Sequence, residues 1–376
     1  MRRALVQLHL WLGLTVGLLW ALQGLTGAAL VLHREIDRWN GPAATSGPMA
    51  SLDRIVAVVE RATGARVERI GIVDARADLL NADYVDAAGV PRALLVDAAA
   101  GAIVAARERE PRSPFTGSAS RWLYTLHEAL LLGHDGEVLV GISGLILLTA
   151  LVTGLWIAWP RRGAWKHIFA AGRWRTPSQR LFGWHRMAGL SVGFALLITV
   201  PCGIYMIFAA EIRPAIAKWV PHQLAAPLPA VSGPATVSSD QALAEVRALF
   251  PGAGFVRLTL PTPQAHAYVI RLRQPSETRA WSGVTSVSID AANGSILDIY
   301  DPLRAPLSNR LADAAFSIHS GELTGLPGRL LLILAGLSLP TLYVTGLLAW
   351  FRKRRMRREK GREGTLFPEP LHAPAE

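Results

Sequence analysis

The sequence predicts a membrane protein: a four-transmembrane-helix bundle, formed by a tandem duplication with parallel repeats, that carries two small α+β domains outside the bilayer. Three observations support this prediction. Of the 376 residues, 51% are hydrophobic and only 18% are charged, below the roughly 25% of ordinary soluble domains. Four long stretches contain no Asp, Glu, Lys or Arg, and histidines and glycines recur in register between the two halves. This composition excludes a disordered chain, a collagen-like chain and a disulfide-rich scaffold.

The four apolar stretches cover residues 4–32, 138–159, 187–210 and 330–351. A spanning helix needs about 20 apolar residues, and each stretch reaches that length. The first is too long for the apolar core of a signal peptide, so we expect it to be retained. We divide the chain accordingly into helix 1–33, outer domain 34–125, helix 126–160, basic cytoplasmic loop 161–184, helix 185–210, outer domain 211–317, helix 318–351 and basic cytoplasmic tail 352–376.

Basic residues set the predicted orientation. The net charge is +11, and positive residues near spanning helices favour the cytoplasmic side. They cluster before the first span, in the middle loop and in the tail, and the loop contains no acid: Arg161, Arg162, Lys166, Arg173, Arg175 and Arg180. Both termini should therefore be cytoplasmic and both outer domains periplasmic, in a bacterial inner membrane. The charge is thus a topology signal, and we expect no nucleic-acid partner.

The two halves of the chain match in ungapped register. A shift of 176 aligns the first span with the third and places His9 on His185. A shift of 192 aligns the second span with the fourth and places His127 on His319. Residues 152–155 (Val-Thr-Gly-Leu) then match residues 344–347. Internal repeats of this kind predict a duplicated fold, and two spans per unit make the copies parallel.

The outer segments repeat as well. Residues 96–103 match residues 289–296, and both read as two strands joined by an Asp/Gly turn. An amphipathic helix precedes each hairpin, over 52–63 and 240–250, with a serine at its N-cap. Gly/Pro-rich linkers over 41–48 and 227–234 separate span and domain. Each outer domain should therefore be a small α+β module.

The paired histidines are the candidate functional residues. A pseudo-twofold axis would bring His9 opposite His185 at the inner side, and His127 opposite His319 at the outer side. Two facing imidazoles inside a helical bundle are typical of axial haem ligation, and neighbouring glycines permit close approach of the macrocycle. Zinc or copper between two histidines is the alternative, although a closed zinc site prefers four ligands.

The remaining histidines and the single cysteine complete the candidates. His33 and His134 break the repeat register and are second-tier candidates for the outer pair. We expect four others to be ordinary surface residues: His167, His222, His266 and His372. Cys202 is the one cysteine, which excludes an intramolecular disulfide and an iron–sulfur cluster. Any haem would be non-covalent, because no CxxCH motif is present.

These motifs resemble the PepSY-associated transmembrane family. The resemblance is carried by Leu8-His9 with Gly13-Leu14, Leu126-His127 with Gly133, Trp184-His185 with Gly189-Leu190, and Ile318-His319-Ser320-Gly321 with Gly325-Leu326-Pro327-Gly328. The outer domains look like PepSY modules. Within the family the chain is most similar to inner-membrane siderophore reductases of the FoxB type, and more loosely to PiuB-type iron-uptake proteins. The resemblance implies two haems b, with iron bound by His9, His127, His185 and His319, and reduction of ferric siderophores on the periplasmic side.

We therefore expect an oxidoreductase of iron uptake that transfers electrons across the lipid bilayer to a ferric siderophore. No dinucleotide fingerprint such as GxGxxG is present, so the electron donor should be a separate cytoplasmic reductase or a quinol. The sequence assigns no substrate-contacting residue. Three alternatives remain at this point: a PepSY regulatory or binding membrane protein, a quinone-linked transmembrane oxidoreductase, and a siderophore transporter.

Overall fold

The computed structural model describes residues 2–73, 76–109, 113, 119–160, 165–170, 174–228 and 235–366. Several predictions fall outside these residues: the loop residues Arg161, Arg162 and Arg173, the end of the second linker at 229–234, and His372. The side chain of His167 is also not described. The chain forms two compact units, Met1–Ala28 with Leu145–Leu197 and Ile333–Glu376, and Ala29–Gly144 with Ile198–Leu332.

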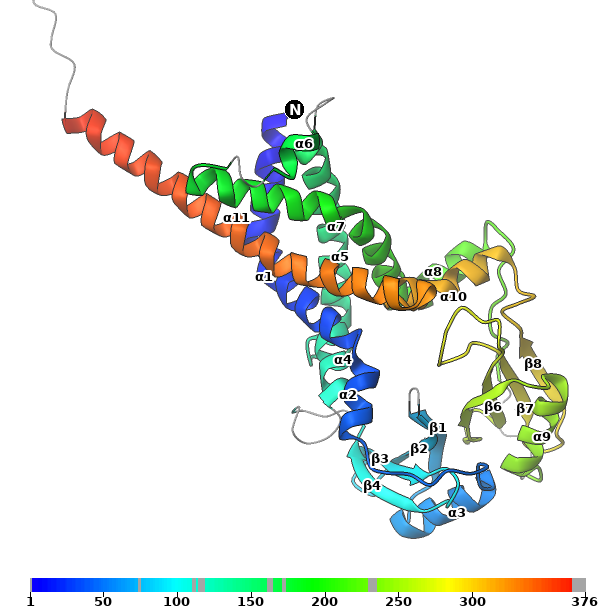
Figure 1. Cartoon of the computed structure of the whole chain (residues 1–376). Helices are drawn as coiled ribbons and strands as arrows, with labels where there is room; N and C mark the ends of the chain where they lie inside the picture. Colours follow the sequence, from blue (N-terminus) through cyan, green and yellow to red (C-terminus); the bar gives the residue numbers. More distant parts are fainter. Residues whose placement is uncertain are drawn as a thin grey trace, which may run out of the picture. The chain divides into compact units, whose positions relative to one another are not determined.

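Four long helices confirm the predicted spans (Figure 1). Each is long and apolar enough to cross a membrane. Each begins before its predicted apolar stretch, because flanking residues also adopt helical geometry. The helices are α1 (Arg2–Leu30), α5 (His134–Ala158), α7 (Pro177–Ile207) and α11 (Leu326–Leu366).

Helices α1 and α11 approach each other backbone to backbone within the first unit. A Cβ atom at Gly336 would lie 2.6 Å from the carbonyl oxygen of Gly24, and a Cβ at Gly24 would meet the carbonyl oxygen of Gly336. Small residues at such crossings are typical of membrane helices, which associate through close packing. Neither glycine tolerates a side chain without separating the two helices.

Short helices separate the spans from the sheet, a feature that the predicted boundaries at 126 and 318 missed. Helix α4 (Ala119–Ala129) ends before α5, and α10 (Leu307–His319) and the 3-10 turn η2 (Glu322–Thr324) precede α11. The glycines at these breaks, Gly133 and Gly325, have positive φ of 62° and 67°, which residues with a side chain rarely adopt. Other short helices are α2 (His33–Asn40), α6 (Trp165–Ile168) and α8 (Ala209–Ala217).

The polar segments form one antiparallel sheet with strand order β4-β3-β2-β1-β5-β6-β7-β8. We predicted two separate modules, and the structure joins them where β1 pairs with β5, with Ile70 opposite Leu258. An unpaired strand edge exposes backbone N–H and C=O groups, and this pairing removes one such edge from each half. The strands are β1 (Val67–Val73), β2 (Arg76–Val85), β3 (Pro91–Asp97), β4 (Ile103–Glu108), β5 (Gly254–Thr259), β6 (Ala267–Arg273), β7 (Ser286–Asp290) and β8 (Ile296–Tyr300).

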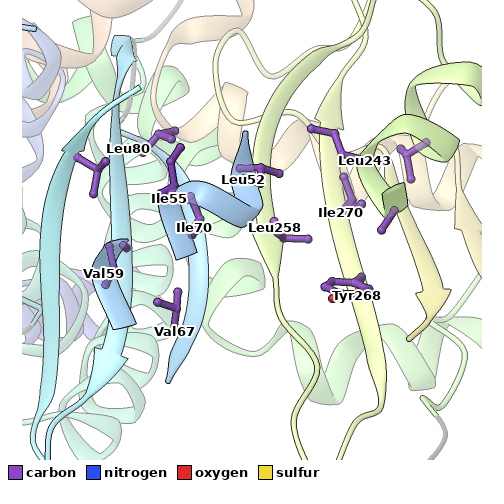
Figure 2. Packing of buried hydrophobic residues seen from close by; sticks show 14 of the residues in the cluster. Leu52, Ile55, Val59, Val67, Ile70, Leu80, Leu243, Leu258, Tyr268 and Ile270 are labelled. Carbon is purple, nitrogen blue, oxygen red and sulfur yellow. The ribbon is translucent and has the colours of Figure 1, made fainter. Parts of the chain in front are cut away.

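Two amphipathic helices cover one face of this sheet and build a single core with it. They are α3 (Leu52–Thr63) and α9 (Ser239–Leu249), close to the predicted ranges. Figure 2 shows Ile55 of α3 and Leu243 of α9 among side chains of the strands, in one cluster of buried residues. Burial on this scale contributes roughly 1.5–3 kcal/mol for each large apolar side chain. The two halves are thus held together by a shared core.

The helices α3 and α9 cap each other reciprocally. The Asp240 carboxylate accepts hydrogen bonds from the Ser51 hydroxyl and from the amide of Leu52 at 2.8 Å. In return, the Asp53 carboxylate accepts from the amide of Ser239 at 2.8 Å. Burial alone would raise the pKa of Asp240, but the hydrogen bonds from Ser51 and Leu52 outweigh it and hold this pKa below its ordinary value. Serine also caps both helices as predicted, through Ser51 and Ser238.

The two Asp/Gly hairpins are present as predicted. The amide of Gly101 donates to the carbonyl of Asp97, and the amide of Gly294 donates to that of Asp290, each at 2.9 Å. Both glycines have positive φ, 64° and 76°, which a side chain would disfavour. Hydrogen bonds from the Ala100 amide and from Thr45 lower the pKa of Asp97 to about 2.

Candidate functional site

His9 and His185 face each other in the first unit. His9 lies on α1 and His185 on α7, and their ring centres are 6.1 Å apart with an interplanar angle of 82°. The Nδ1 of His9 donates to the carbonyl oxygen of Ala150 at 3.0 Å. The Nδ1 of His185 donates to the carbonyl oxygen of Leu342, also at 3.0 Å. A hydrogen bond at Nδ1 fixes the tautomer and leaves the Nε2 lone pair available to a metal.

His127 and His319 face each other in the second unit. They lie near the ends of α4 and α10, and their ring centres are 6.2 Å apart with an interplanar angle of 51°. The Nδ1 of His319 donates to the carbonyl oxygen of Thr199 at 2.9 Å. Two neighbours of this pair, Leu130 and Leu131, have φ of 53° and 61°, a conformation that costs non-glycine residues energy and often marks functional sites.

Glycines hold three of the four imidazoles against helix backbones. A Cβ atom at Gly154 would lie 2.7 Å from Cε1 of His9, and one at Gly203 would lie 2.8 Å from Cε1 of His319. At Gly346 the corresponding distance to Cε1 of His185 is 3.4 Å. The rings therefore occupy the space that a side chain would fill, and their orientation depends on these glycines.

The spacing of both pairs fits axial ligation of one metal by two imidazoles. A metal–nitrogen bond of about 2.0 Å, with about 1.2 Å more to each ring centre, places two such centres about 6.4 Å apart. The observed 6.1 and 6.2 Å match that value. The inner pair also has open space beside it, at the glycines that follow each histidine by one helical turn, on α1 and on α7. A Cβ at Gly13 would meet no atom within 4 Å, and one at Gly189 only Leu342 Cδ2 at 3.7 Å. The donor set and the open space fit a haem.

A mononuclear zinc or copper site with more ligands is less well supported. Among the residues that the structure describes, no three or more His, Cys, Asp or Glu side chains gather where they could hold a metal ion. Closed zinc sites use four ligands, whereas bis-axial haem ligation requires two from the protein.

The second-tier histidines lie at helix starts and have hydrogen-bonding partners of their own. The Nδ1 of His33 donates to the carbonyl oxygen of Leu30 at 2.6 Å, at the start of α2. His134 begins α5, its side chain is 83% exposed, and its Nδ1 is 3.4 Å from the Glu137 carboxylate. The structure brings His127 together with His319, whereas the side chain of His134 is largely exposed.

Two of the expected surface histidines differ from prediction. His266 is 6% exposed, so its surface assignment is wrong. The reason is that the chain turns into β6 beside the β7–β8 hairpin, where the amide of Ala291 donates to the His266 carbonyl at 3.1 Å. His222 is half-buried, and its Nδ1 donates to the Ser308 hydroxyl at 3.0 Å. Burial lowers the pKa of His222, with a further contribution from Arg213.

Sequence reasoning did not assign the groups that hold the rings. Three backbone carbonyls accept from Nδ1, at Ala150, Leu342 and Thr199, and backbone acceptors leave no mark in side-chain identity. The glycines did leave a signal: Gly154 and Gly346 are equivalent in the 192-residue register. That equivalence could have linked them to His9 and His185.

The comparison with protein families shows which family this chain belongs to. The description of the matching family is "PepSY-associated TM region", and the match covers residues 6–353. The chain therefore belongs to the PepSY-associated transmembrane family, and with its four apolar helices it is a membrane protein. A comparison with curated proteins gives no match.

Proposed function

We propose that this membrane protein is a ferric-siderophore reductase that binds two haems b and releases Fe(II) in the periplasm. The observation that supports the proposal is the pair of facing imidazoles in each unit, at the spacing that axial ligation of one iron requires. When bound, haem b supplies a one-electron Fe(III)/Fe(II) couple. In the substrate, one electron converts Fe(III) to Fe(II), and the siderophore is released chemically unchanged.

The residues of the chain hold and orient the ligands. His9 and His185 would bind one iron, and His127 and His319 the other. Carbonyl acceptors such as Ala150 hold the proton on Nδ1, which leaves the Nε2 lone pair available to a metal. Because each iron would be held by two histidines of the chain, a bound haem would favour electron transfer over oxygen binding.

Tandem duplication with parallel repeats is part of the proposal and has support from the hydrogen bonds. The acceptor of His185, Leu342, is equivalent to Ala150, the acceptor of His9, in the 192-residue register. The basic termini favour an orientation in the inner membrane of a bacterium with both ends cytoplasmic. In that orientation the sheet and the outer histidine pair belong to the periplasmic side.

A quinol or a cytoplasmic reductase would donate the electrons, and a pocket favours the quinol. The pocket has a volume of about 350 Å³ and is lined by Pro177, Arg180, Leu181, Leu348, Phe351 and Arg352. Leu181 is one helical turn from His185, and Leu348 is one turn from Thr345, whose hydroxyl lies 3.2 Å from Nδ1 of His185. A largely apolar lining near His185 suits the ring and tail of a quinone.

A reduced-minus-oxidised spectrum of the purified protein, with the haem-to-protein ratio, tests the cofactor. We expect two low-spin b-type haems per chain. A colourless protein from haem-replete cells would defeat the proposal and favour the PepSY regulatory function. High-spin spectra from both sites would contradict bis-histidine ligation.

The activity is tested by reoxidation. The haems are reduced with dithionite, the excess is removed, and ferric hydroxamate or catecholate siderophore is added without oxygen in the presence of an Fe(II) trap. We expect haem reoxidation with a stoichiometric Fe(II) signal. Haem that stays reduced with every siderophore, yet reoxidises with quinone, would make the protein a quinone-linked oxidoreductase.

A further inference from the structure

The face of the sheet opposite α3 and α9 carries a row of arginines. Alternate residues of a strand point to opposite faces, and Ile70, Leu258 and Ile270 point into the core. Their neighbours Arg69 on β1, Arg257 on β5 and Arg271 on β6 therefore point to the other side. The strand register places Arg257 directly opposite Arg271. We call this surface the arginine face.

Arg257 and Arg271 face each other, and the acids whose charges act on them also have other partners. Like charges directly opposite each other in a sheet are destabilising, and both side chains are half-buried. The charge of Asp83 acts on Arg257, but the Asp83 carboxylate already accepts from Arg69 Nε at 2.8 Å. Within the described ranges, Nε of Arg271 is buried without a hydrogen-bond partner. Burial, and then the charges of Arg257 and Arg279, lower the pKa of Arg271 to about 10.

The other acids near this face are committed elsewhere. The Glu277 carboxylate accepts from the amide of Gln274 at 2.9 Å and from the hydroxyl of Thr285 at 2.6 Å. The Asp313 carboxylate accepts from the Tyr300 hydroxyl and lies 3.8 Å from Arg213. A buried charge without a partner is costly, so the arrangement points to an anion that arrives from outside the chain.

The arginine face extends toward the outer histidine pair. Arg279, whose charge acts on Arg271, lies over the ring of Phe316 at 4.9 Å. Its Nε donates to the carbonyl oxygen of Asp313 at 3.4 Å. Phe316 is three residues, about one helical turn, before His319 on α10. An anion held by Arg271 would therefore lie beside the element that carries an outer ligand.

We propose that Arg257 and Arg271 form a binding site for an anionic ferric chelate, in which carboxylate or catecholate groups hold the iron. The inference rests on the proposed function and specifies its substrate class. Two guanidinium forks suit bidentate contacts with carboxylate or phenolate oxygens. The electron passes to Fe(III) of the chelate and gives Fe(II), and no bond of the organic ligand is broken. The surplus positive charge selects anionic chelates over cationic ones.

Binding is measured with gallium(III) citrate, an anionic chelate of a trivalent metal that a haem does not reduce. Isothermal titration on the purified full-length protein compares wild type with Arg257→Gln, Arg271→Gln and the double variant. We expect each substitution to weaken binding about tenfold, the loss of one charge-assisted hydrogen bond. Gallium(III) desferrioxamine B, which carries a positive charge, should bind weakly and equally to all four proteins.

Three controls make the result decisive. Arg61→Gln removes the same charge from the exposed surface of α3 and should leave citrate-chelate binding unchanged. Arg271→Lys keeps the charge and should retain part of the affinity if Arg271→Gln proves unstable. The melting temperature of Arg271→Gln should equal or exceed that of wild type, because a like-charge contact is removed. A lower melting temperature with unchanged binding would assign these arginines to the fold and overturn the inference.

Failure of this inference and failure of the proposed function are distinguishable. Unchanged gallium citrate affinity in the double variant overturns the inference, whatever the reductase assay shows. Equal binding of citrate without metal also overturns it, because the site would then recognise free carboxylates. Arginine-dependent binding of the gallium chelate with no reduction of ferric citrate would support the site but defeat the reductase function.

Discussion

Replacing Gly154 by alanine should displace the ring of His9 and, if the proposed haems are bound, empty the inner haem site. The new methyl group would lie 2.7 Å from Cε1 and 3.2 Å from Nδ1 of His9. To restore a contact of about 3.4 Å, the ring must move away by about 0.7 Å, several times the roughly 0.2 Å by which metal–ligand distances vary. The same movement stretches the 3.0 Å hydrogen bond to Ala150, which lies one turn earlier on the same helix. Overpacking of this kind costs about 1–3 kcal/mol.

The assay for Gly154→Ala is the haem content per chain together with the low-spin spectrum. We expect the inner haem to be lost or to become high-spin, while the outer haem remains. Gly346→Ala is the matched control in the other half, because its Cβ would lie 3.4 Å from Cε1 of His185, an ordinary contact. Gly203→Ala, at 2.8 Å from Cε1 of His319, should affect the outer haem alone. Two intact low-spin haems in Gly154→Ala, or equal damage from Gly346→Ala, would refute the reasoning.

Further outcomes follow from single side chains. His185→Ala should empty the inner site and His127→Ala the outer one, each leaving about one haem per chain. If His127→Ala instead keeps two haems while His134→Ala loses one, the outer ligand is His134. Asp240→Asn should lower the free energy of unfolding by about 1 kcal/mol, as for a lost helix cap, measured by thermal denaturation at pH 7. Since folding lowers the pKa of Asp240, its contribution is present above the unfolded pKa and fades in acid, so wild type and variant should converge below about pH 4. Because folding lowers the pKa of Asp97 to about 2, its carboxylate should stabilise its hairpin from neutral pH down to about pH 4 and lose that effect toward pH 2. An Asp97→Ala variant whose loss of stability relative to wild type stays constant over that pH range would contradict this role of the Asp97 carboxylate.

Much of the fold could be predicted because it depends on local patterns. The four spans follow from apolar length, and the helices 52–63 and 240–250 follow from their amphipathic periodicity and serine caps. The hairpins at Asp97 and Asp290 follow from turn chemistry, which requires glycine at a left-handed position. The facing histidines were predicted from register alone, since equivalent residues of a repeat lie opposite each other about its axis.

Tertiary structure decided the features that depend on non-local contacts. The pairing of β1 with β5 merges the two outer modules into one sheet, and no pattern within either half specifies which strand edges will meet. The breaks after Ala129 and His319 place His127 and His319 on short helices, a consequence of backbone geometry at the following turns. The backbone carbonyls that orient the imidazoles, and the burial of His266, are likewise invisible in side-chain identity.

The sequence by itself determined which residues are apolar, which are paired in register and which side of the membrane the basic segments favour. Only the tertiary structure decided the 6.1 and 6.2 Å ring spacings and the meeting of Arg257 with Arg271 across two strands. The physical reason is the sequence separation of the interacting residues. Helix periodicity, capping and turns depend on residues a few positions apart. The ring spacings depend on side chains more than a hundred residues apart, and the charges that gather on one sheet face depend on a strand register that the whole core sets.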